Sequence, residues 1–210
     1  MAGLVLYNYE LDENSYRVRL FLAMLGLEWK TIAVDMFPGR EQTKPEMLAR
    51  TPLGTMPVVE DGGLTLFGTG AILAYLAKAY DTAGTWLPDE PSAFGEVMKW
   101  LGFSETALAP AVSARLQALF DTPGDEKALQ AEARRAFRVM DDHMTARQID
   151  GSEWFAGSGP TLADLALFPS FALSRDFGVD HDEFPALRRW IRRFRALPAF
   201  HTMPGIPDYH

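Results

Sequence analysis

A strand, a polar turn and a helix follow one another within residues 4–27, and this arrangement constrains the fold more than any other stretch. The stretch begins with Leu-Val-Leu-Tyr, which is typical of a β-strand. Apolar residues then recur at i, i+3, i+4 and i+7, which predicts a helix that ends near Gly26. The turn between them holds Asp12, Asn14 and Ser15, all favourable N-cap residues. Because a helix start has unpaired N–H groups and partial positive charge, this turn is a candidate anion site.

Further elements complete a β-α-β-α-β-β-α order within the first 80 residues. A second strand over 31–34 follows the first helix, which predicts parallel strands joined by a right-handed crossover. We then expect a short helix over 45–49, a strand that Pro57 opens, and a hairpin turn at 61–63. Another helix begins at about Thr69. This order predicts an α/β domain.

The rest of the chain has helical periodicity. A linker rich in Gly, Pro and Asp over 81–91 separates a domain of residues 1–80 from an all-α domain of residues 92–210. Thr161 and Asp164 have the spacing of a capping box, with Asp in place of Glu or Gln, and open a nearly all-apolar helix. The last helix carries a basic face, which we expect to be exposed to solvent. Its arginines are Arg188, Arg189, Arg192, Arg193 and Arg195.

Cysteine is absent from the 210 residues, which excludes disulfides, thiolate metal sites and a cysteine nucleophile. Sulfur chemistry would therefore need a sulfur that arrives with a ligand. The 4 histidines are scattered, so we expect no metal site. A net charge of -8 argues against general nucleic-acid binding. No apolar run is long enough to span a membrane, and Met1, Ala2 and Gly3 lack a basic signal-peptide segment, so we expect a cytoplasmic protein.

Four local motifs occur in a characteristic order. They are Asn-Ser-Tyr-Arg-Val-Arg from Asn14, Pro-Leu-Gly-Thr-Met-Pro-Val-Val from Pro52, Thr-Gly-Ala-Ile-Leu-Ala-Tyr-Leu from Thr69 and Pro-Thr-Leu-Ala-Asp-Leu-Ala from Pro160. With these motifs the chain resembles the cytosolic glutathione transferase family, and bacterial members most, over nearly its whole length. The resemblance implies a thioredoxin-like N-terminal domain, an all-α C-terminal domain, glutathione as co-substrate and usually a homodimer.

The resemblance also implies which residues hold glutathione. They are Gln42, Lys44, Thr55, Met56, Pro57, Gly68 and Thr69. The backbone of Met56 would pair with the cysteinyl part of the tripeptide, an arrangement that favours a cis bond to Pro57. Thr69 and the helix N-terminus behind it would hold the γ-glutamyl group, whereas Gly68 replaces an acidic residue usual in the family. Gln42 and Lys44 would hold the glycyl carboxylate.

Such an enzyme must ionise the glutathione thiol, and the resemblance locates this step at the first helix. Lowering a thiol pKa by about two units takes about 2.7 kcal/mol. One hydrogen bond to the anion supplies about 1.5–3 kcal/mol, and a helix N-terminus adds about 0.3–1 kcal/mol. We rank the donors Ser15, then Asn14, then Tyr7, with a helix cap as the alternative role of Ser15.

Asp12 stands where many relatives have a serine. An ionised Asp12 about 6 Å from a thiolate would oppose it by about 3 kcal/mol at an effective dielectric constant of 20. We therefore expect Asp12 to point away as a helix cap, or the protein to be a poor transferase.

Three functions follow from the residues and the resemblance. The first is detoxifying conjugation of glutathione to a small hydrophobic electrophile, bound between the domains near Trp100, Phe103 and Leu108, which suit a core equally well. The second is glutathione or partner binding with little catalysis, for which Asp12 and Gly68 are the evidence. The third is glutathione-dependent isomerisation or dehalogenation. Disulfide reduction is disfavoured, because relatives with that activity use a cysteine at the first turn.

Overall fold

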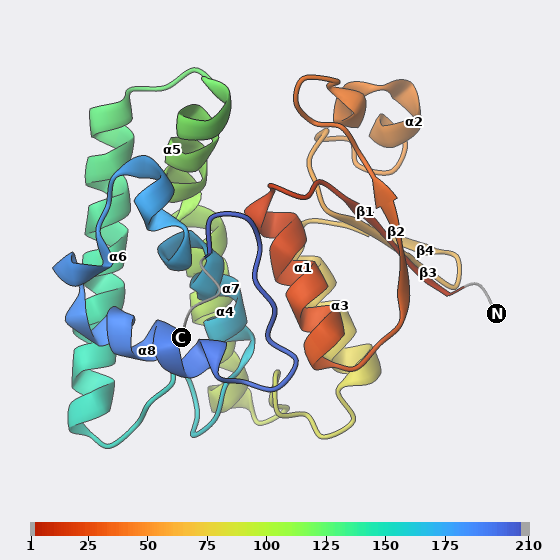
Figure 1. Ribbon diagram of the computed structural model, residues 1–210. Helices are drawn as coiled ribbons and strands as arrows, with labels where there is room; N and C mark the ends of the chain where they lie inside the picture. The colour runs from red at the N-terminus through yellow and green to blue at the C-terminus, as the bar shows by residue number, and fades with distance from the viewer. Residues whose placement is uncertain (1–2, 207–210) are drawn as a thin grey trace. The chain divides into compact units, whose positions relative to one another are not determined.

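The computed structural model describes residues 3–206, which form two compact units (Figure 1). The first unit runs to Thr82 and includes Pro198–Met203, and the second contains Ala83–Leu197 and the residues from Pro204. The sequence-based domain limits, 1–80 and 92–210, stay a prediction. The absence of a signal peptide was inferred in part from Met1 and Ala2, and His210 is one of the four histidines. All three residues lie outside the described residues. Along residues 3–206, none of the helices combines the length and apolar character needed to span a bilayer.

The first unit contains a four-stranded mixed sheet in the order β2-β1-β3-β4. The strands are β1 (Leu4–Asn8), β2 (Trp29–Ala33), β3 (Val58–Asp61) and β4 (Leu64–Phe67). β1 is parallel to β2, whereas β3 is antiparallel to both β1 and β4. The predicted βαβ unit and hairpin are therefore confirmed. The predicted limits of the second strand, 31–34, are wrong, because pairing with β1 begins at Trp29, opposite Leu4, and ends at Ala33.

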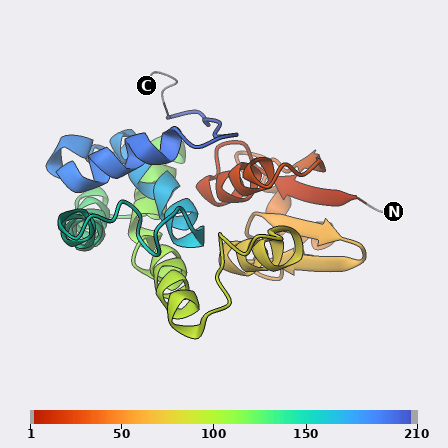
Figure 2. The ribbon, with the colours of Figure 1, turned by 90° about the horizontal axis from the view of Figure 1, so that it is seen from below.

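Helices lie on both faces of this sheet. They are α1 (Glu13–Met24), α2 (Pro45–Leu48), α3 (Thr69–Tyr80) and a 3-10 helix (Glu41–Thr43). α1 and α3 lie side by side on one face (Figures 1 and 2). On the other face, Met47 of α2 packs with Tyr7, Met56 and Val58. The start of α1, the start of α3 and the residues before β3 are thus fixed to one rigid sheet.

The C-terminal segment Pro198–Met203 returns to the first unit, which no periodicity in the sequence predicts. The hydroxyl of Tyr16 in α1 donates to the His201 carbonyl at 2.6 Å. The two rings make an edge-to-face contact at 5.8 Å. Part of α1 is therefore covered by residues far away in the sequence.

The second unit is helical. Its elements are α4 (Pro91–Thr106), α5 (Ala109–Phe120), α6 (Glu126–Ile149), α7 (Leu162–Ala172), α8 (Pro185–Arg195) and two 3-10 helices (Ser174–Phe177 and His181–Glu183). Pro110 occupies the first turn of α5, where a missing N–H has little cost. The break near Pro110 therefore separates α4 from α5.

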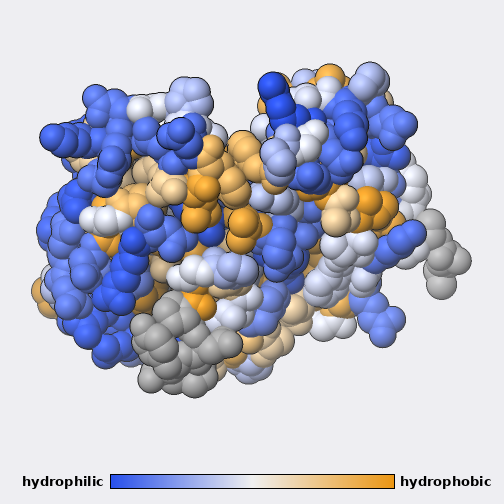
Figure 3. Space-filling model, turned by 45° about the horizontal axis from the view of Figure 1, so that its top comes forward, coloured by the Kyte–Doolittle hydropathy of each residue, from blue (hydrophilic) through white to orange (hydrophobic). Residues whose placement is uncertain are grey.

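The surface is mainly hydrophilic on the face shown in Figure 3, where hydrophobic side chains gather in smaller patches. β4 is an edge strand, and two of its apolar side chains, Leu64 and Phe67, are 42% and 40% exposed. An exposed apolar edge strand is a common site of association between chains.

A buried carboxylate organises the second unit. Thr161 and Asp164 form the predicted capping box at the start of α7, which is confirmed. The Asp164 carboxylate also accepts hydrogen bonds from the Phe155 N–H at 3.0 Å and from Trp190 Nε1 of α8 at 2.9 Å. This one side chain therefore joins α7, the preceding loop and α8.

We predict that Asp164→Asn lowers the free energy of unfolding by about 2–4 kcal/mol at pH 7, because one carboxylate oxygen becomes a donor that faces other donors. Burial raises the pKa of Asp164 to about 6. Its stabilising contribution is therefore present at low pH and is lost as pH rises from about 4 to about 6. Urea denaturation should give a difference between wild type and variant that is about 1 kcal/mol larger at pH 5 than at pH 7. A difference that does not change with pH would contradict the raised pKa.

Candidate functional site

The turn between β1 and α1 is closed by Asp12, the N-cap residue of α1. Its Oδ2 accepts a hydrogen bond from the Ser15 N–H at 2.6 Å, and Asp12 is buried. Burial raises the pKa of Asp12, and hydrogen bonds with Ser15 partly oppose this rise. The expected capping role of Asp12 is confirmed.

Ser15, the first-ranked donor, is completely buried. Its Oγ accepts a hydrogen bond from the Tyr9 N–H at 3.5 Å, inside the turn. A bound thiol could reach this hydroxyl only if the turn opened. The position of Ser15 therefore favours its alternative role in closing the helix start.

Asn14, the second candidate, is partly exposed. Its Oδ1 accepts a hydrogen bond from Arg17 Nη1 at 2.5 Å. Its amide nitrogen makes no hydrogen bond within residues 3–206, so two N–H groups are available to a ligand. Arg17 is itself buried and forms an ion pair with Glu13 at 3.0 Å. This pair was not predicted from the sequence, although a spacing of four residues on a helix is a recognisable signal.

Tyr7, the third candidate, is tied to the sheet. Its hydroxyl donates to Glu60 Oε2 at 3.2 Å. Arg50 lies 4.9 Å from the centre of the Tyr7 ring and donates to Glu60 Oε1 at 2.9 Å. The Tyr7 hydroxyl is therefore already engaged with β3.

The segment before β3 has an unusual backbone. The Met56–Pro57 peptide bond is cis, as predicted, and both residues are buried. Among the described residues, no hydrogen bond is formed by the Met56 N–H or C=O. Thr55 is exposed, and its N–H donates to Thr51 Oγ1 at 3.4 Å. The Met56 N–H and C=O are thus unpaired within residues 3–206.

The start of α3 follows a glycine. Gly68 is the N-cap residue, has φ of 85° and is exposed, and Thr69 begins the helix half-buried. A positive φ suits glycine, because a side chain would be strained there. Gly68 has no side chain to cap α3, so the N-cap residue does not neutralise the partial positive charge at this helix start.

Gln42 and Lys44 differ in their surroundings. Gln42 is 9% exposed, and its Oε1 is buried with no hydrogen-bond partner in the part of the chain that the structure describes. Lys44 is exposed and pairs with Glu41 at 2.9 Å. An unpaired buried amide oxygen is costly, so Gln42 is the more specific feature of this segment.

The region around Trp100, Phe103 and Leu108, which the sequence suggested for the electrophile, is mainly hydrophobic core. Trp100 and Leu108 are buried, and Phe103 is partly buried. The Trp100 ring packs against Phe103 at 5.2 Å and Phe155 at 4.9 Å. Within the second unit these side chains stabilise the packing of α4.

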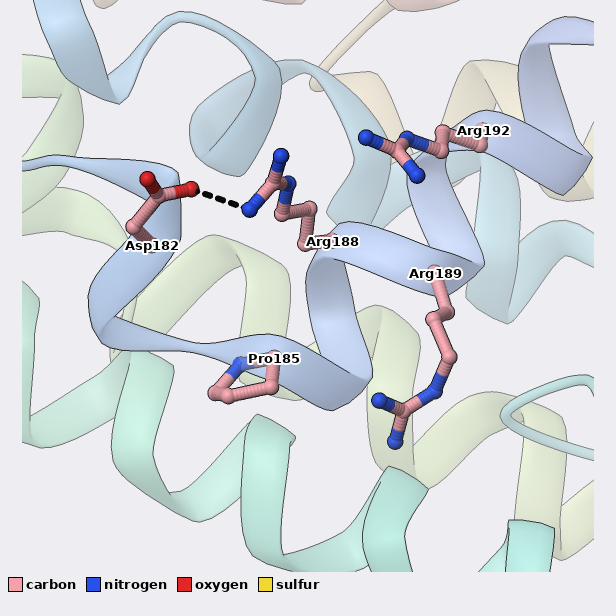
Figure 4. A pocket seen from close by; sticks show the side chains of 5 residues that line it. All are labelled: Asp182, Pro185, Arg188, Arg189 and Arg192. Carbon is pink, nitrogen blue, oxygen red and sulfur yellow. Dashed lines mark ion pairs between the residues drawn. The ribbon is translucent and has the colours of Figure 1, made fainter.

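The basic face of α8 borders a surface pocket of about 270 Å³ (Figure 4). Arg188, Arg189 and Arg192 are exposed, as predicted. Arg188 reaches Asp182 at 2.6 Å, whereas Arg189 points to the other side of the helix and donates to Gln148 at 2.8 Å and 2.6 Å. Arg193 and Arg195 are only partly exposed. Arg192, Arg193 and Arg195 lie in the last turn of α8, where cations are favourable on their own, and Arg188 and Arg189 already have partners, so this face needs no ligand.

No group of three or more His, Cys, Asp or Glu side chains suited to a metal ion occurs within residues 3–206. The features that suit a ligand therefore lie on the first unit, at the β1–α1 turn, before β3 and at the start of α3.

Comparison with known proteins agrees with this geometry. Residues 2–78 match the glutathione S-transferase N-terminal domain, and residues 100–198 match the C-terminal domain. The chain is 32% identical to a maleylacetoacetate isomerase of Rhizobium meliloti over 93% of each protein. It is 28% identical to the disulfide-bond oxidoreductase YfcG of Escherichia coli, over 89% of this chain and 87% of that protein.

A solved structure is similar over almost the whole chain. It is the crystal structure of a glutathione transferase homologue from Lodderomyces elongisporus with two GSH per subunit. It has a TM-score of 0.85 and 25% sequence identity, over 95% of this chain and 96% of that one. The matched domains, the relatives and the fold agree: this chain belongs to the glutathione S-transferase family.

Proposed function

We propose that this protein is a glutathione transferase that binds glutathione on its first unit, ionises the thiol and joins the sulfur to a small hydrophobic electrophile. The observation that carries the proposal is the similarity, over 95% of the chain, to a homologue with two GSH per subunit. Polar groups at the β1–α1 turn, before β3 and at the start of α3 support it.

The proposed glutathione site has one surface for each part of the tripeptide. Its residues are Gln42, Lys44, Thr55, Met56, Pro57, Gly68 and Thr69. The free backbone groups of Met56 support pairing with the cysteinyl part. Thr69 at the start of α3 supports binding of the γ-glutamyl carboxylate by a hydroxyl and a helix N-terminus. The donors for the glycyl carboxylate in this proposal are Gln42 Nε2 and the Lys44 ammonium, because the buried Gln42 Oε1 is itself an acceptor.

Asn14 is the thiol-activating donor in this proposal, ahead of Ser15 and Tyr7. Its amide nitrogen is available, whereas the Ser15 hydroxyl is buried and the Tyr7 hydroxyl bonds to Glu60. A hydrogen bond to a thiolate supplies about 1.5–3 kcal/mol, which is enough to lower the thiol pKa by one to two units.

Asp12 is committed to the helix cap, as expected for an aspartate that points away from the thiol. Its Oδ2 is engaged by the Ser15 N–H at 2.6 Å, and its side chain is buried within the turn. This arrangement supports catalysis over the alternative of a binding protein with little activity.

Two other reactions have specific support among the relatives. The 32% identity to a maleylacetoacetate isomerase favours glutathione-dependent isomerisation as the second candidate. Similarity to a disulfide-bond oxidoreductase adds disulfide reduction to the reactions that need testing, although this chain contains no cysteine. A cytoplasmic location also stays a prediction.

We also propose that the protein is a homodimer. The exposed Leu64 and Phe67 on edge strand β4 support an interface at this strand. Sedimentation velocity distinguishes a dimer from the 23.4 kDa monomer.

We predict that the protein binds glutathione and that the bound thiol ionises well below the ordinary cysteine pKa of about 8.5. Calorimetry measures binding, and the ultraviolet absorbance of the thiolate against pH measures ionisation. Binding with a normally titrating thiol would contradict the enzyme and leave the weakly catalytic alternative. Product analysis with an aromatic halide, a cis-trans isomerisable diketo acid and a mixed disulfide then separates the three reactions.

We predict that Thr69→Ala weakens glutathione binding about tenfold, because one hydroxyl bond to a carboxylate is worth about 1.5 kcal/mol. Thr69→Ser is the matched control, since it keeps the hydroxyl and should bind within about twofold of wild type. Calorimetry at pH 7 gives both affinities. Equal affinity of the Ala and Ser variants would remove Thr69 from the site.

A further inference from the structure

The start of α1 contains a buried ion pair that the proposed function does not use. Glu13 Oε1 lies 3.0 Å from Arg17 Nη2, and each side chain is 2% exposed. Removing two charges from water is costly, and the attraction between them offsets this cost only in favourable geometry. Stabilisation of the fold is therefore a weak explanation for a buried ion pair, so we consider a second role for Glu13 and Arg17.

Arg17 also holds a neighbour. Its Nη1 donates to Asn14 Oδ1 at 2.5 Å, while its Nη2 donates to Glu13 Oε1 at 3.0 Å. Asn14 and Glu13 precede Arg17 by three and four residues, so all three share one face of the first turns of α1. The rigid fork of one guanidinium thus links the ion pair to the amide.

The chemistry of the guanidinium decides which end of the amide it contacts. Arginine is a donor only, so the Asn14 atom that faces it must be the oxygen. The nitrogen is then the end left to a ligand. An amide that turned freely would also present its oxygen, which repels a thiolate.

We propose that Arg17, held in place by Glu13, is a positioning residue: it orients the Asn14 amide so that Nδ2 donates to the glutathione sulfur. This inference rests on the proposed function and deepens it. Asn14 touches the sulfur, and Arg17 acts through Asn14.

The sharpest variant is Asn14→Ala, which removes the donor and adds no charge, whereas Asn14→Asp would add a carboxylate that opposes a thiolate by itself. In Asn14→Ala, Arg17 keeps its ion pair with Glu13, so no buried charge is left unpaired and the melting temperature should stay close to that of wild type. The pKa of the bound thiol, read from thiolate absorbance, should rise by about one or more. An unchanged thiol pKa would overturn the role of Asn14, and with it that of Arg17.

The second variant is the pair Glu13→Gln with Arg17→Met, which removes both buried charges together. We expect glutathione to bind within about fivefold of wild type and the thiol pKa to rise as it does in Asn14→Ala, by about one. Adding Asn14→Ala to this pair should cause no further rise, because residues that act through one contact are not additive. A further rise of the same size would overturn the coupling.

Two more variants separate positioning from a structural role. Arg17→Lys keeps the charge opposite Glu13 but not the planar fork, so it should keep the melting temperature and raise the thiol pKa. If the paired variant does not fold, Arg17→Lys and Asn14→Ala decide. Arg115→Met removes another buried arginine, which pairs with Asp176 at 2.8 Å, and should lower stability without changing the thiol pKa.

The wild-type measurement distinguishes failure of this inference from failure of the proposed function. If wild type does not bind glutathione, the proposed function is wrong. If wild type binds and lowers the thiol pKa, but Arg17→Lys and the paired variant lower it equally, only the positioning role is wrong.

Discussion

Buried aspartates accept hydrogen bonds from N–H groups at the starts of three helices, and the structure depends on these contacts. Asp12 accepts from the first turn of α1, and Asp164 closes the start of α7. Asp141 of α6 accepts from the Ala186 and Leu187 N–H groups of α8 at 2.9 Å and 3.0 Å. The first N–H groups of a helix have no backbone partner, so a buried helix start needs such an acceptor.

The same requirement shapes the chemistry at α1. Capping engages Asp12 and the backbone of Ser15 and leaves the serine side chain buried. Asn14, which lies between the two members of the ion pair in the sequence, keeps a donor that is unpaired among the described residues. In the function that we propose, Asp12 caps the helix and Asn14 activates the thiol, so an aspartate in place of the usual serine does not remove the activating group.

Periodicity and turn chemistry were sufficient for most of the fold. The order of elements, the hairpin and the capping box at Thr161 all follow from local patterns. The limits of β2 did not, because pairing with β1, from Leu4 opposite Trp29 to Asn8 opposite Ala33, sets where the strand begins and ends. Nor did the return of residues 198–203 to α1, since that contact joins Tyr16 to His201 across 185 positions.

The sequence by itself determined the α/β and all-α halves, the family and the segments that a glutathione site would use. It also determined that a reactive thiol must come from a ligand, because the chain has no cysteine. The two halves and the absence of cysteine follow from composition, spacing and short-range hydrogen bonding, whereas the family and the glutathione segments come from the resemblance of four local motifs. Only the tertiary structure decided which candidate donor is accessible. Ser15, Asn14 and Tyr7 are all capable of donating, but burial of the first, the Arg17 contact of the second and the Glu60 contact of the third depend on how α1 and β3 pack.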